Sequence, residues 1–516
     1  MGYLDVSRYI KVNEKDNVAI VVNDEGLGKG AILDNKLELQ DNIPFGHKFA
    51  LKNLKKGESV IRYGEIIGYV NQEVSKGQWI NEKVLYIKEP AKLSNDLNTV
   101  SNPNQFYRFK DRPKITDRFF LGHKNKDGTV GTRNILAIST TVQCAEGVVN
   151  AAADKIRKEL LPKYQNVDDV VALNHLYGCG VAINAENSEI PKRTIRNLID
   201  NPNFGNERLI VSLGCEKFTP EDAFDISNIE DKNNIVVLQE YNGFLAMITA
   251  ICKKAEEILQ RLNIRKRVPC SVSELVVGLQ CGGSDALSGV TANPAIGYAA
   301  DLLVLSGAKV MFSEVTEVRD AAHLLLKRIK DPSIKKKLID ELLWYDNYLN
   351  EGKVDRSANP SPGNKKGGLA TIIEKALGSI AKSGTSEIID VLAPGEKVKK
   401  AGLTYAATPA SDFVCGTQQL ASGITLQVFS TGRGTTYNLR QVPVIKVSTN
   451  NYLSNKWLDL IDINAGTIAS GEKTIKEVGE EIYELIIKIA SGEVKTCADK
   501  YQLYNQLAVF NPAPIT

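Results

Sequence analysis

The sequence lacks the segments by which membrane, secreted and nucleic-acid-binding proteins are recognised. No apolar run reaches the ~18 residues that a membrane-spanning helix needs. The first residues, "MGYLDVSRYIKVNEKDN", have no apolar core of a secretory signal. Charge of neither sign is in excess, because the net charge is only +3 with 64 basic and 61 acidic residues. These absences predict a cytoplasmic protein that binds neither membrane nor nucleic acid.

Several catalytic signatures are also missing. There is no CxxC, HExxH or P-loop pattern, which argues against zinc ribbons, zincin proteases and NTPases. There is no GxSxG and no GxGxxG after a predicted strand, so a serine hydrolase or a dinucleotide-binding protein has no support. Histidine is scarce, with four residues, and eight cysteines in 516 residues are too few for a disulfide framework. The cysteines are therefore expected to be reduced thiols.

The pattern of the chain changes twice. Residues 1–90 are short β-like runs punctuated by glycine, which predicts a small all-β domain. Residues 91–118 are polar and without period, and they predict a linker. Beyond them apolar runs alternate with helical stretches, which predicts an α/β middle domain (119–267) and an α/β C-terminal domain (268–516) with a mostly parallel sheet. Residues 355–386, rich in Gly, Pro and Ser, predict a functional loop.

The periodicity also predicts individual elements of the two α/β domains. Strands are expected at 134–140, 169–175, 208–214, 234–239, 274–280, 309–315, 402–408, 425–431 and 442–449. Helices are expected at about 145–160, 241–262, 294–306, 318–330, 411–422 and 474–491.

Four cysteines directly follow predicted strands: Cys144, Cys179, Cys215 and Cys281. Ligands of open α/β sheets bind beyond the carboxyl ends of the strands, so these thiols are placed where a site is expected. Glycines flank three of them, and His175 precedes Cys179 by four residues. The alternative is that each cysteine is a small buried hydrophobe and the histidine a structural residue. Both interpretations stay open.

Two loops contain further polar groups between glycines. "GLQCGGSDALSGVTANPAIG" carries Ser284 and Asp285 after Cys281, and its glycines allow a ligand to approach the backbone closely. "STGRGTTYN" carries Arg433, whose guanidinium could bind a carboxylate through two hydrogen bonds. A surface turn with a solvated arginine is the alternative for the second loop.

Together, the motifs of this chain resemble those of the altronate/galactarate dehydratase family. They run in order from residue 9 or so to the C-terminal "FNPAPIT": "IPFGHKFAL", "VIRYGEIIGY", "DGTVGTRNILAI", "NHLYGCGVAINA", "VSLGCEK", "GLQCGGSDALSGVTANPA", "SEVTEVRDA", "NPSPGNKKGG", "FSTGRGT" and "INAGTIASGE". "GQWINE", in place of a His-rich segment, favours the galactarate-type members. Thr436 and Asn438 depart from the family's "TGRGTPYG", which bears on substrate choice because proline and glycine set the backbone freedom of a loop.

The resemblance implies a fold and a reaction. The implied fold is a small β-clip (SAF-type) domain, a middle domain used for homodimerisation and a Rossmann-like C-terminal domain. The implied reaction is the loss of water from a six-carbon sugar diacid, galactarate, with iron(II) as cofactor. The alternatives are a dehydratase of another sugar acid such as altronate, a non-catalytic sugar-acid-binding protein, and a lyase that removes sulfite.

Dehydration of a hydroxy acid needs a base for the α-proton, stabilisation of the enediolate and help for the leaving hydroxyl. Iron could supply the second and third in two ways, which the sequence leaves open. Mononuclear Fe(II) would take nitrogen and oxygen ligands, and an iron–sulfur cluster would take three thiolates. The candidates for the first are His47, His175, Asp285 and Glu314, and those for the second are Cys144, Cys179 and Cys281.

The remaining roles follow the same chemistry. His175 is the predicted base, with Lys217 of "GCEK" as the alternative, since a desolvated lysine can titrate in the working range. Substrate carboxylates are expected to meet Arg433, Lys365 and Lys446, while Ser284 and Asp285 bind the diol or the metal shell. Each lysine has the alternative of being a solvated surface charge. His47 and residues 62–65 of the β domain are predicted to close over the site as a lid.

Overall fold

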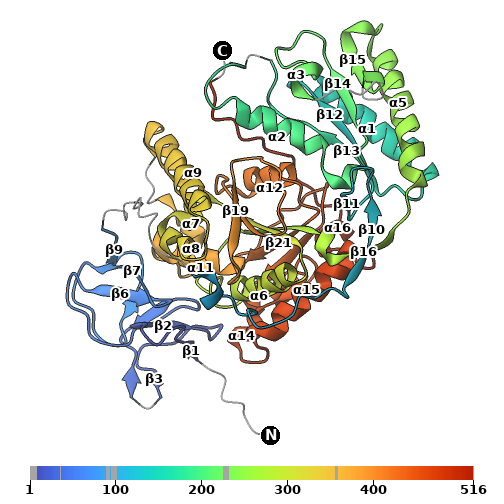
Figure 1. Ribbon diagram of the computed structural model, residues 1–516. Helices are drawn as coiled ribbons and strands as arrows, with labels where there is room; N and C mark the ends of the chain where they lie inside the picture. Colours follow the sequence, from blue (N-terminus) through green and yellow to red (C-terminus); the bar gives the residue numbers. More distant parts are fainter. Residues whose placement is uncertain are drawn as a thin grey trace.

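The computed structural model of the chain describes residues 8–34, 36–88, 93, 102–179, 181–224, 232–354 and 358–514. Figure 1 shows three regions: an N-terminal module, a middle region around one small sheet, and a large C-terminal region around a second sheet. Within these residues no helix is both long and apolar enough to cross a membrane.

The N-terminal module is built of short strands and turns, as predicted. Its strands are β1 (Tyr9–Ile10), β2 (Val18–Val21), β3 (Ile32–Leu33), β4 (Leu37–Glu38), β5 (Lys48–Ala50), β6 (Ser59–Arg62), β7 (Glu65–Val70), β8 (Trp79–Ile80) and β9 (Leu85–Tyr86). One antiparallel sheet has the order β1-β2-β5-β8 and another has the order β6-β7-β9. Residues 91, 92 and 94–101 of the predicted linker 91–118 lie outside the described residues. The end of the linker packs on the C-terminal region, where the rings of Phe109 and Tyr298 are 5.3 Å apart.

The middle region holds a four-stranded parallel sheet of order β13-β12-β14-β15. Its elements are β12 (Ile135–Thr140), α1 (Glu146–Glu159), β13 (Asp169–Leu173), α2 (Glu189–Ile199), β14 (Leu209–Ser212), α3 (Pro220–Ala223), β15 (Ile235–Val237) and α5 (Phe244–Ile264). α1 and α5 cover one face of this sheet, and α2 lies between the other face and the C-terminal region (Figure 1). The strands β10 (Phe119–Lys124), β11 (Val130–Gly131) and β16 (Val268–Ser271) form a small antiparallel sheet between the two regions.

The C-terminal region is built on seven parallel strands in the order β19-β20-β18-β17-β21-β22-β23, which confirms the predicted parallel sheet. The strands are β17 (Val276–Cys281), β18 (Lys309–Ser313), β19 (Ile388–Leu392), β20 (Gly402–Ala406), β21 (Leu426–Thr431), β22 (Val444–Ser448) and β23 (Ile463–Asn464). β17 and β21 are buried along their whole length, as expected for central strands covered on both faces. The chain leaves β17 toward β18 on one side and returns to β21 on the other, so the order switches direction at β17.

The helices of this region are α6 (Ala292–Leu305), α7 (Val315–Val318), α8 (Ala322–Leu326), α9 (Pro332–Glu351), α10 (Pro362–Lys366), α11 (Ile372–Ile380), α12 (Asp412–Ala421), α13 (Asn451–Lys456), α14 (Gly466–Ala469), α15 (Ile475–Ala490) and α16 (Cys497–Lys500). α15 shows why such segments are predictable. A capping box of Thr474 and Glu477 starts it, and apolar residues four apart, such as Val478, Ile482 and Ile486, face the core.

Several expectations about elements were wrong or incomplete, and α2 and β19 were not among the expected elements. The predicted helix 318–330 is two short helices, α7 and α8, joined by a turn of 3-10 helix. The predicted loop 355–386 contains α10 and α11, because the caps Ser361 and Thr371 each accept a hydrogen bond from the first helical turn. The helix α9 was missed, although Asp331 as N-cap and Pro332 at the first position are ordinary start signals.

The N-terminal module is held to the C-terminal region by buried charges. Glu374 of α11 accepts hydrogen bonds from Lys48 of β5, at 2.9 Å, and from Arg62 of β6. Lys48 also donates to the carbonyl oxygen of Gly368, at 2.7 Å. All three charged side chains are at most 1% exposed. The module is therefore a fixed part of the described structure.

Candidate active site

The candidate site lies where the strand order of the large sheet switches direction. Cys281 is the last residue of β17, Glu314 directly follows β18, and Asp412 opens α12 after β20. Parallel strands end at one edge of a sheet, so these residues meet although they are far apart in the sequence. Glu314 has a left-handed backbone with φ 80°, which is strained for a side chain of this size.

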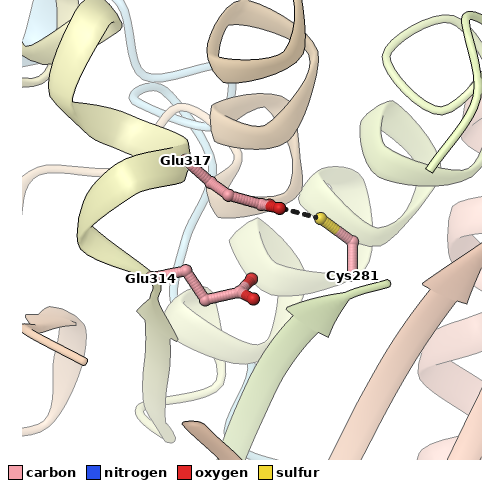
Figure 2. A group of neighbouring side chains, drawn as sticks. All are labelled: Cys281, Glu314 and Glu317. Atoms are coloured by element: carbon pink, nitrogen blue, oxygen red, sulfur yellow. Dashed lines mark hydrogen bonds between the residues drawn. The ribbon is translucent and has the colours of Figure 1, made fainter. Parts of the chain in front are cut away.

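Cys281, Glu314 and Glu317 form a buried cluster (Figure 2). The Cys281 thiol donates to Glu317 Oε2 at 3.2 Å, while Glu314 extends toward the same space from the start of the same short helix. The Lys382 ammonium lies between the acidic and sulfur atoms, with Nζ 3.1 Å from Cys281 Sγ and 3.2 Å from Glu314 Oε2. Ser379 accepts from Lys382 at 2.7 Å and donates to Glu317 at 3.1 Å. Lys382 thus supplies the positive charge that the buried carboxylates of the cluster need.

A second lysine connects this cluster to a cavity of about 500 Å³. The Lys375 ammonium lies 2.8 Å from Glu317 Oε1 and donates to Asn359 Oδ1 at 3.0 Å. Lys375 lies in α11, and Lys382 follows it seven residues later in the turn after that helix. The cavity is lined by Lys375, Glu317, Asp412, Asn359, Asn364 and Gly283, and by apolar side chains of α9. Its volume and polar groups suit a small polyhydroxy acid.

The charges of the cluster set distinct protonation states. Burial, with the charge of Glu317 second, raises the pKa of Cys281 to about 12, so the thiol is neutral. Burial would raise the pKa of Glu317 as well, but Lys375 and Lys382 outweigh it and hold that pKa well below its ordinary value. Burial and the neighbouring Glu317 raise the pKa of Glu314. For the same two reasons the pKa of Asp412 rises to about 6. Asp412 therefore changes charge close to neutral pH.

The cluster does not fit a resident iron(II) ion. Among the described residues, Cys281, Glu314 and Glu317 alone bring three potential ligand atoms within 4.8 Å of one another. The Lys382 ammonium nevertheless occupies the position of a cation between these atoms, and the thiol keeps its proton. An ion there would have to displace a buried lysine and deprotonate the thiol.

Asp285 and Ser284, predicted to bind the diol, have structural partners. The buried Asp285 carboxylate accepts hydrogen bonds from Thr449 at 2.7 Å, Ser288 at 3.0 Å and Asn450 at 3.1 Å. The Ser284 carbonyl accepts from the Asn364 amide at 2.8 Å. Asp285 therefore joins the loop after β17 to the loop after β22, and its role beside the cavity is to position that loop.

We expect Gly432→Ala to destabilise the protein by about 1–3 kcal/mol, because a buried site with no free space cannot accept an added methyl group. A Cβ at Gly432 would lie 2.2 Å from the Asp285 carboxyl carbon, which its hydrogen bonds hold in place. Urea denaturation of the variant measures the loss. Gly28→Ala is the matched control, since the nearest atom to its added Cβ is 3.8 Å away. Equal midpoints for both variants would contradict the packing described.

The other predicted site residues of the middle region lie on a different sheet. Cys144, Cys179 and Lys217 follow β12, β13 and β14, so they are not grouped with Cys281. His175 is buried: its Nδ1 accepts from the Tyr177 amide at 3.1 Å and its Nε2 donates to the Thr140 carbonyl at 2.7 Å. Burial lowers the pKa of His175 to about 4. These contacts make it a structural residue that ties the loop after β13 to β12.

The pKa of His175 predicts that stability declines in mild acid. The folded-state pKa of about 4 is below the unfolded value of about 6.5, so the unfolded state takes up the proton first. The contribution of neutral His175 to the free energy of unfolding is fully present above pH ~6.5 and is lost as the pH falls to 4. The loss amounts to roughly 3 kcal/mol, because each unit of pKa difference corresponds to about 1.4 kcal/mol. Urea unfolding at several pH values should show a smaller acid loss in His175→Gln than in wild type. His323→Gln, with a half-exposed ring, is the control and should keep the wild-type slope.

The structure also shows the positions of the other four predicted site residues, which are His47, Lys365, Arg433 and Lys446. His47 Nδ1 accepts from the Trp79 indole at 3.2 Å and its Nε2 lies 3.1 Å from the Lys366 carbonyl, so it joins the module to α10. Lys365 lies on α10, while Arg433 is exposed and its amide donates to the Gly283 carbonyl at 2.8 Å. Lys446 is buried within β22, away from the residues that line the cavity. Arg433 thus borders the cavity through Gly283.

Sequence reasoning missed Glu317, Lys375, Lys382 and Asp412. Glu317 had a usable signal, because it is three residues after Glu314 and such a pair shares one face of a helix. Asp412 opens a predicted helix after a predicted strand, which is also a signal. The two lysines had none, since they lie about a hundred residues after Cys281 in a segment expected to be a loop.

Comparison with known proteins covers nearly the whole chain. Residues 7–88 match the altronate/galactarate dehydratase SAF domain, residues 122–263 the second domain of D-galactarate dehydratase/altronate hydrolase, and residues 272–515 the C-terminal domain of D-galactarate/altronate dehydratase. The chain is 56% identical to galactarate dehydratase (L-threo-forming) of Escherichia coli, over 98% of this chain and 97% of that protein. It is 32% identical to the altronate dehydratase of the same organism, over 98% and 99%. It is also 29% identical to (2R)-sulfolactate sulfo-lyase subunit beta of Chromohalobacter salexigens, over 73% of this chain and 94% of that protein.

Proposed function

Since the chain belongs to the altronate/galactarate dehydratase family, we propose that it eliminates water from galactarate to give 5-dehydro-4-deoxy-D-glucarate. The proposal rests on the 56% identity to a galactarate dehydratase over almost the full length of both chains. The observation in the structure that supports it is the cavity beside Lys375, Glu317 and Asp412. The chain is less similar to the altronate dehydratase and to the sulfo-lyase subunit, so galactarate is the favoured substrate.

The cavity offers a base and a positioned cation for the elimination. Asp412 is the proposed proton acceptor, because its pKa of about 6 leaves it ionised at neutral pH but still basic enough to take a proton. Lys375 is the proposed stabiliser of the enediolate, since its ammonium lines the cavity and developing negative charge is best met by a positioned cation. Glu317 orients Lys375 through their 2.8 Å ion pair.

These roles give a balanced reaction. The Asp412 carboxylate takes the proton from the carbon next to one substrate carboxylate, and the electron pair forms the enediolate beside Lys375. The hydroxyl on the next carbon leaves with the electrons of its C–O bond and takes the proton from Asp412, which completes one molecule of water and restores the carboxylate. The resulting enol becomes the ketone by moving its hydroxyl proton to carbon. Asn359 and Asn364 on the cavity wall can bind the remaining hydroxyls.

Iron(II), which the resemblance implies, has no step in this scheme. Its expected effect in the family is to polarise a carboxylate and a hydroxyl. The Cys281–Glu314–Glu317 cluster does not suit it, because the Lys382 ammonium already lies between these ligand atoms.

Anaerobic turnover with iron(II) and thiol present tests the proposed function. Galactarate, altronate and glucarate would be offered in parallel, and formation of the 2-keto acid would be followed with and without a chelator. Product from galactarate at the highest kcat/KM is the expected result. Turnover of altronate in preference would move the assignment to the other branch of the family. Binding of galactarate without turnover of any of the three would favour a sugar-acid-binding protein.

We further propose that the C-terminal region is Rossmann-like and that the protein is a cytoplasmic homodimer. The parallel sheet with a switch point at β17 supports the first part, and the family resemblance supports the second. Sedimentation velocity at micromolar concentration tests the assembly, and a monomer under those conditions would contradict it.

A further inference from the structure

Three thiols are exposed at one edge of the middle sheet. Cys144, Cys179 and Cys215 are the exposed cysteines of the chain, while its other five are buried or partly buried. Cysteine is ordinarily among the most buried residue types, so exposure of all three in one place is unusual. They follow β12, β13 and β14, which are direct neighbours in the order β13-β12-β14.

The loops that carry these cysteines are fastened to a common point, Thr141. A Cβ at Gly178 would lie 2.3 Å from the Thr141 carbonyl oxygen, so the backbone just before Cys179 packs directly on the loop after β12. The Thr141 hydroxyl donates to the Glu216 carboxylate, and Cys215 is the residue before Glu216. Cys144 follows Thr141 by three residues. All three cysteines are therefore one to three residues from the same anchor.

Hydrogen bonds of other side chains hold this arrangement, and the Cys215 sulfur adds one contact by accepting from the Gln239 amide at 3.4 Å. The Glu216 carboxylate also accepts from the Ser212 hydroxyl at 2.6 Å and from the Gly214 amide at 2.7 Å. His175 fixes the loop after β13 to the Thr140 carbonyl at 2.7 Å. The Glu216 carboxylate and the His175 ring are satisfied by these contacts, and the three cysteines are exposed. Such a preorganised set of side chains is typical of a ligand site.

The spacing of the thiols favours a cluster over a single ion. Zn–S bonds of about 2.3 Å in tetrahedral geometry place sulfur atoms about 3.8 Å apart. In the described part of the chain, the group of three ligands within 4.8 Å is Cys281, Glu314 and Glu317, so the three exposed thiols are farther apart than a single ion requires. A cluster binds each thiolate through a different iron and therefore accepts a wider spacing. Thiolates are also the ligands that select iron–sulfur clusters.

We propose that Cys144, Cys179 and Cys215 hold an iron–sulfur cluster of the four-iron class at the carboxyl edge of the middle sheet. Each thiol gives up its proton when it binds iron. Three protein ligands leave the fourth iron facing outward, open to an oxygen ligand from solvent or from a hydroxy acid. The site goes beyond the proposed function and does not depend on the identity of the substrate.

The test is the metal and sulfide content of the full-length protein, purified without oxygen and then incubated with equal amounts of iron(II) and iron(III), with sulfide and with thiol. Wild type is expected to bind about four iron and four acid-labile sulfide atoms per chain, as a four-iron cluster requires, and to show the broad visible absorption of an iron–sulfur chromophore. Cys144→Ser, Cys179→Ser and Cys215→Ser are each expected to lose most of the sulfide and the absorption. Cys252→Ser and Cys281→Ser are the matched controls and should keep both. Far-ultraviolet circular dichroism confirms that each variant is folded.

Each other outcome overturns the proposal. Wild type that binds no labile sulfide, or that binds zinc instead, excludes the cluster. Loss of the cluster in Cys281→Ser, with retention in Cys215→Ser, would move the ligands to a different set of residues. Galactarate turnover is measured separately: an intact cluster without turnover would count against the proposed function alone, and turnover by folded protein without sulfide would count against the cluster alone.

Discussion

Replacing Asp412 by Asn is expected to lower kcat for galactarate by about 10²- to 10⁴-fold, the usual contribution of a positioned proton acceptor. The amide is close to the carboxylate in shape but cannot accept the α-proton. For wild type, kcat/KM should rise with pH through about 6, because burial and Glu317 raise the pKa of Asp412 to that value and the ionised form is the active one. Steady-state kinetics over pH 4.5–8 (a range of about two pH units around this pKa) measures both effects.

The pH profile separates a catalytic role of Asp412 from a structural one. In the Asp412→Asn variant the acid limb near pH 6 should disappear from the residual activity, whereas a merely misfolded enzyme would keep it. Asp390→Asn is the control, because Asp390 lies on β19 away from the cavity and pairs with the half-exposed Lys400 at 3.6 Å. An unchanged acid limb in Asp412→Asn would assign the proton transfer to another residue.

Replacing Glu374 by Gln is expected to destabilise the attachment of the N-terminal module by about 3–5 kcal/mol, the usual cost of leaving buried charges without their partner. The substitution removes the one carboxylate that Lys48 and Arg62 share, and all three side chains are at most 1% exposed. The urea transition followed by Trp79 fluorescence should move to lower concentration, because the Trp79 indole is bonded to His47 at the same interface.

The control for this prediction is an exposed ion pair of the same module. Glu58 pairs with Lys52 at 2.7 Å, and both side chains are at least a third exposed. Solvent-exposed pairs contribute little to stability, so Glu58→Gln should leave the transition in place. A Glu374→Gln protein with the wild-type transition would mean that the module is not held by this ion cluster in solution.

The sequence alone predicted the order of the regions, because the type of each region is visible in its local pattern of apolar and polar residues. Apolar runs such as 274–280 and 425–431 are central parallel strands, and the alternation around them marks the change from the all-β module to the α/β regions. The capping box at Thr474 and the apolar stripe after it define α15 in the same way. The predicted loop after Cys281 is also the loop that borders the cavity.

The partners of each candidate residue could not be predicted, because long-range packing decides them. Four cysteines share one sequence context, yet Cys281 ends a strand of the large sheet and the other three follow strands of the small one. His175 is a predicted base, but the sequence does not show that its ring is buried and that both ring nitrogens are hydrogen-bonded to backbone groups.

The amino-acid sequence by itself determined the family, the order of the regions and the residues that end the central strands. Tertiary structure alone decided that Lys382 comes to lie 3.1 Å from Cys281, 101 residues earlier in the chain. The physical reason is that strand periodicity and helix caps depend on near neighbours, whereas the charge of a buried site depends on which distant groups are desolvated together. For this protein, Cys281 is a metal ligand in the expectation from sequence, whereas in the structure burial raises the pKa of its thiol and Lys382 lies beside it.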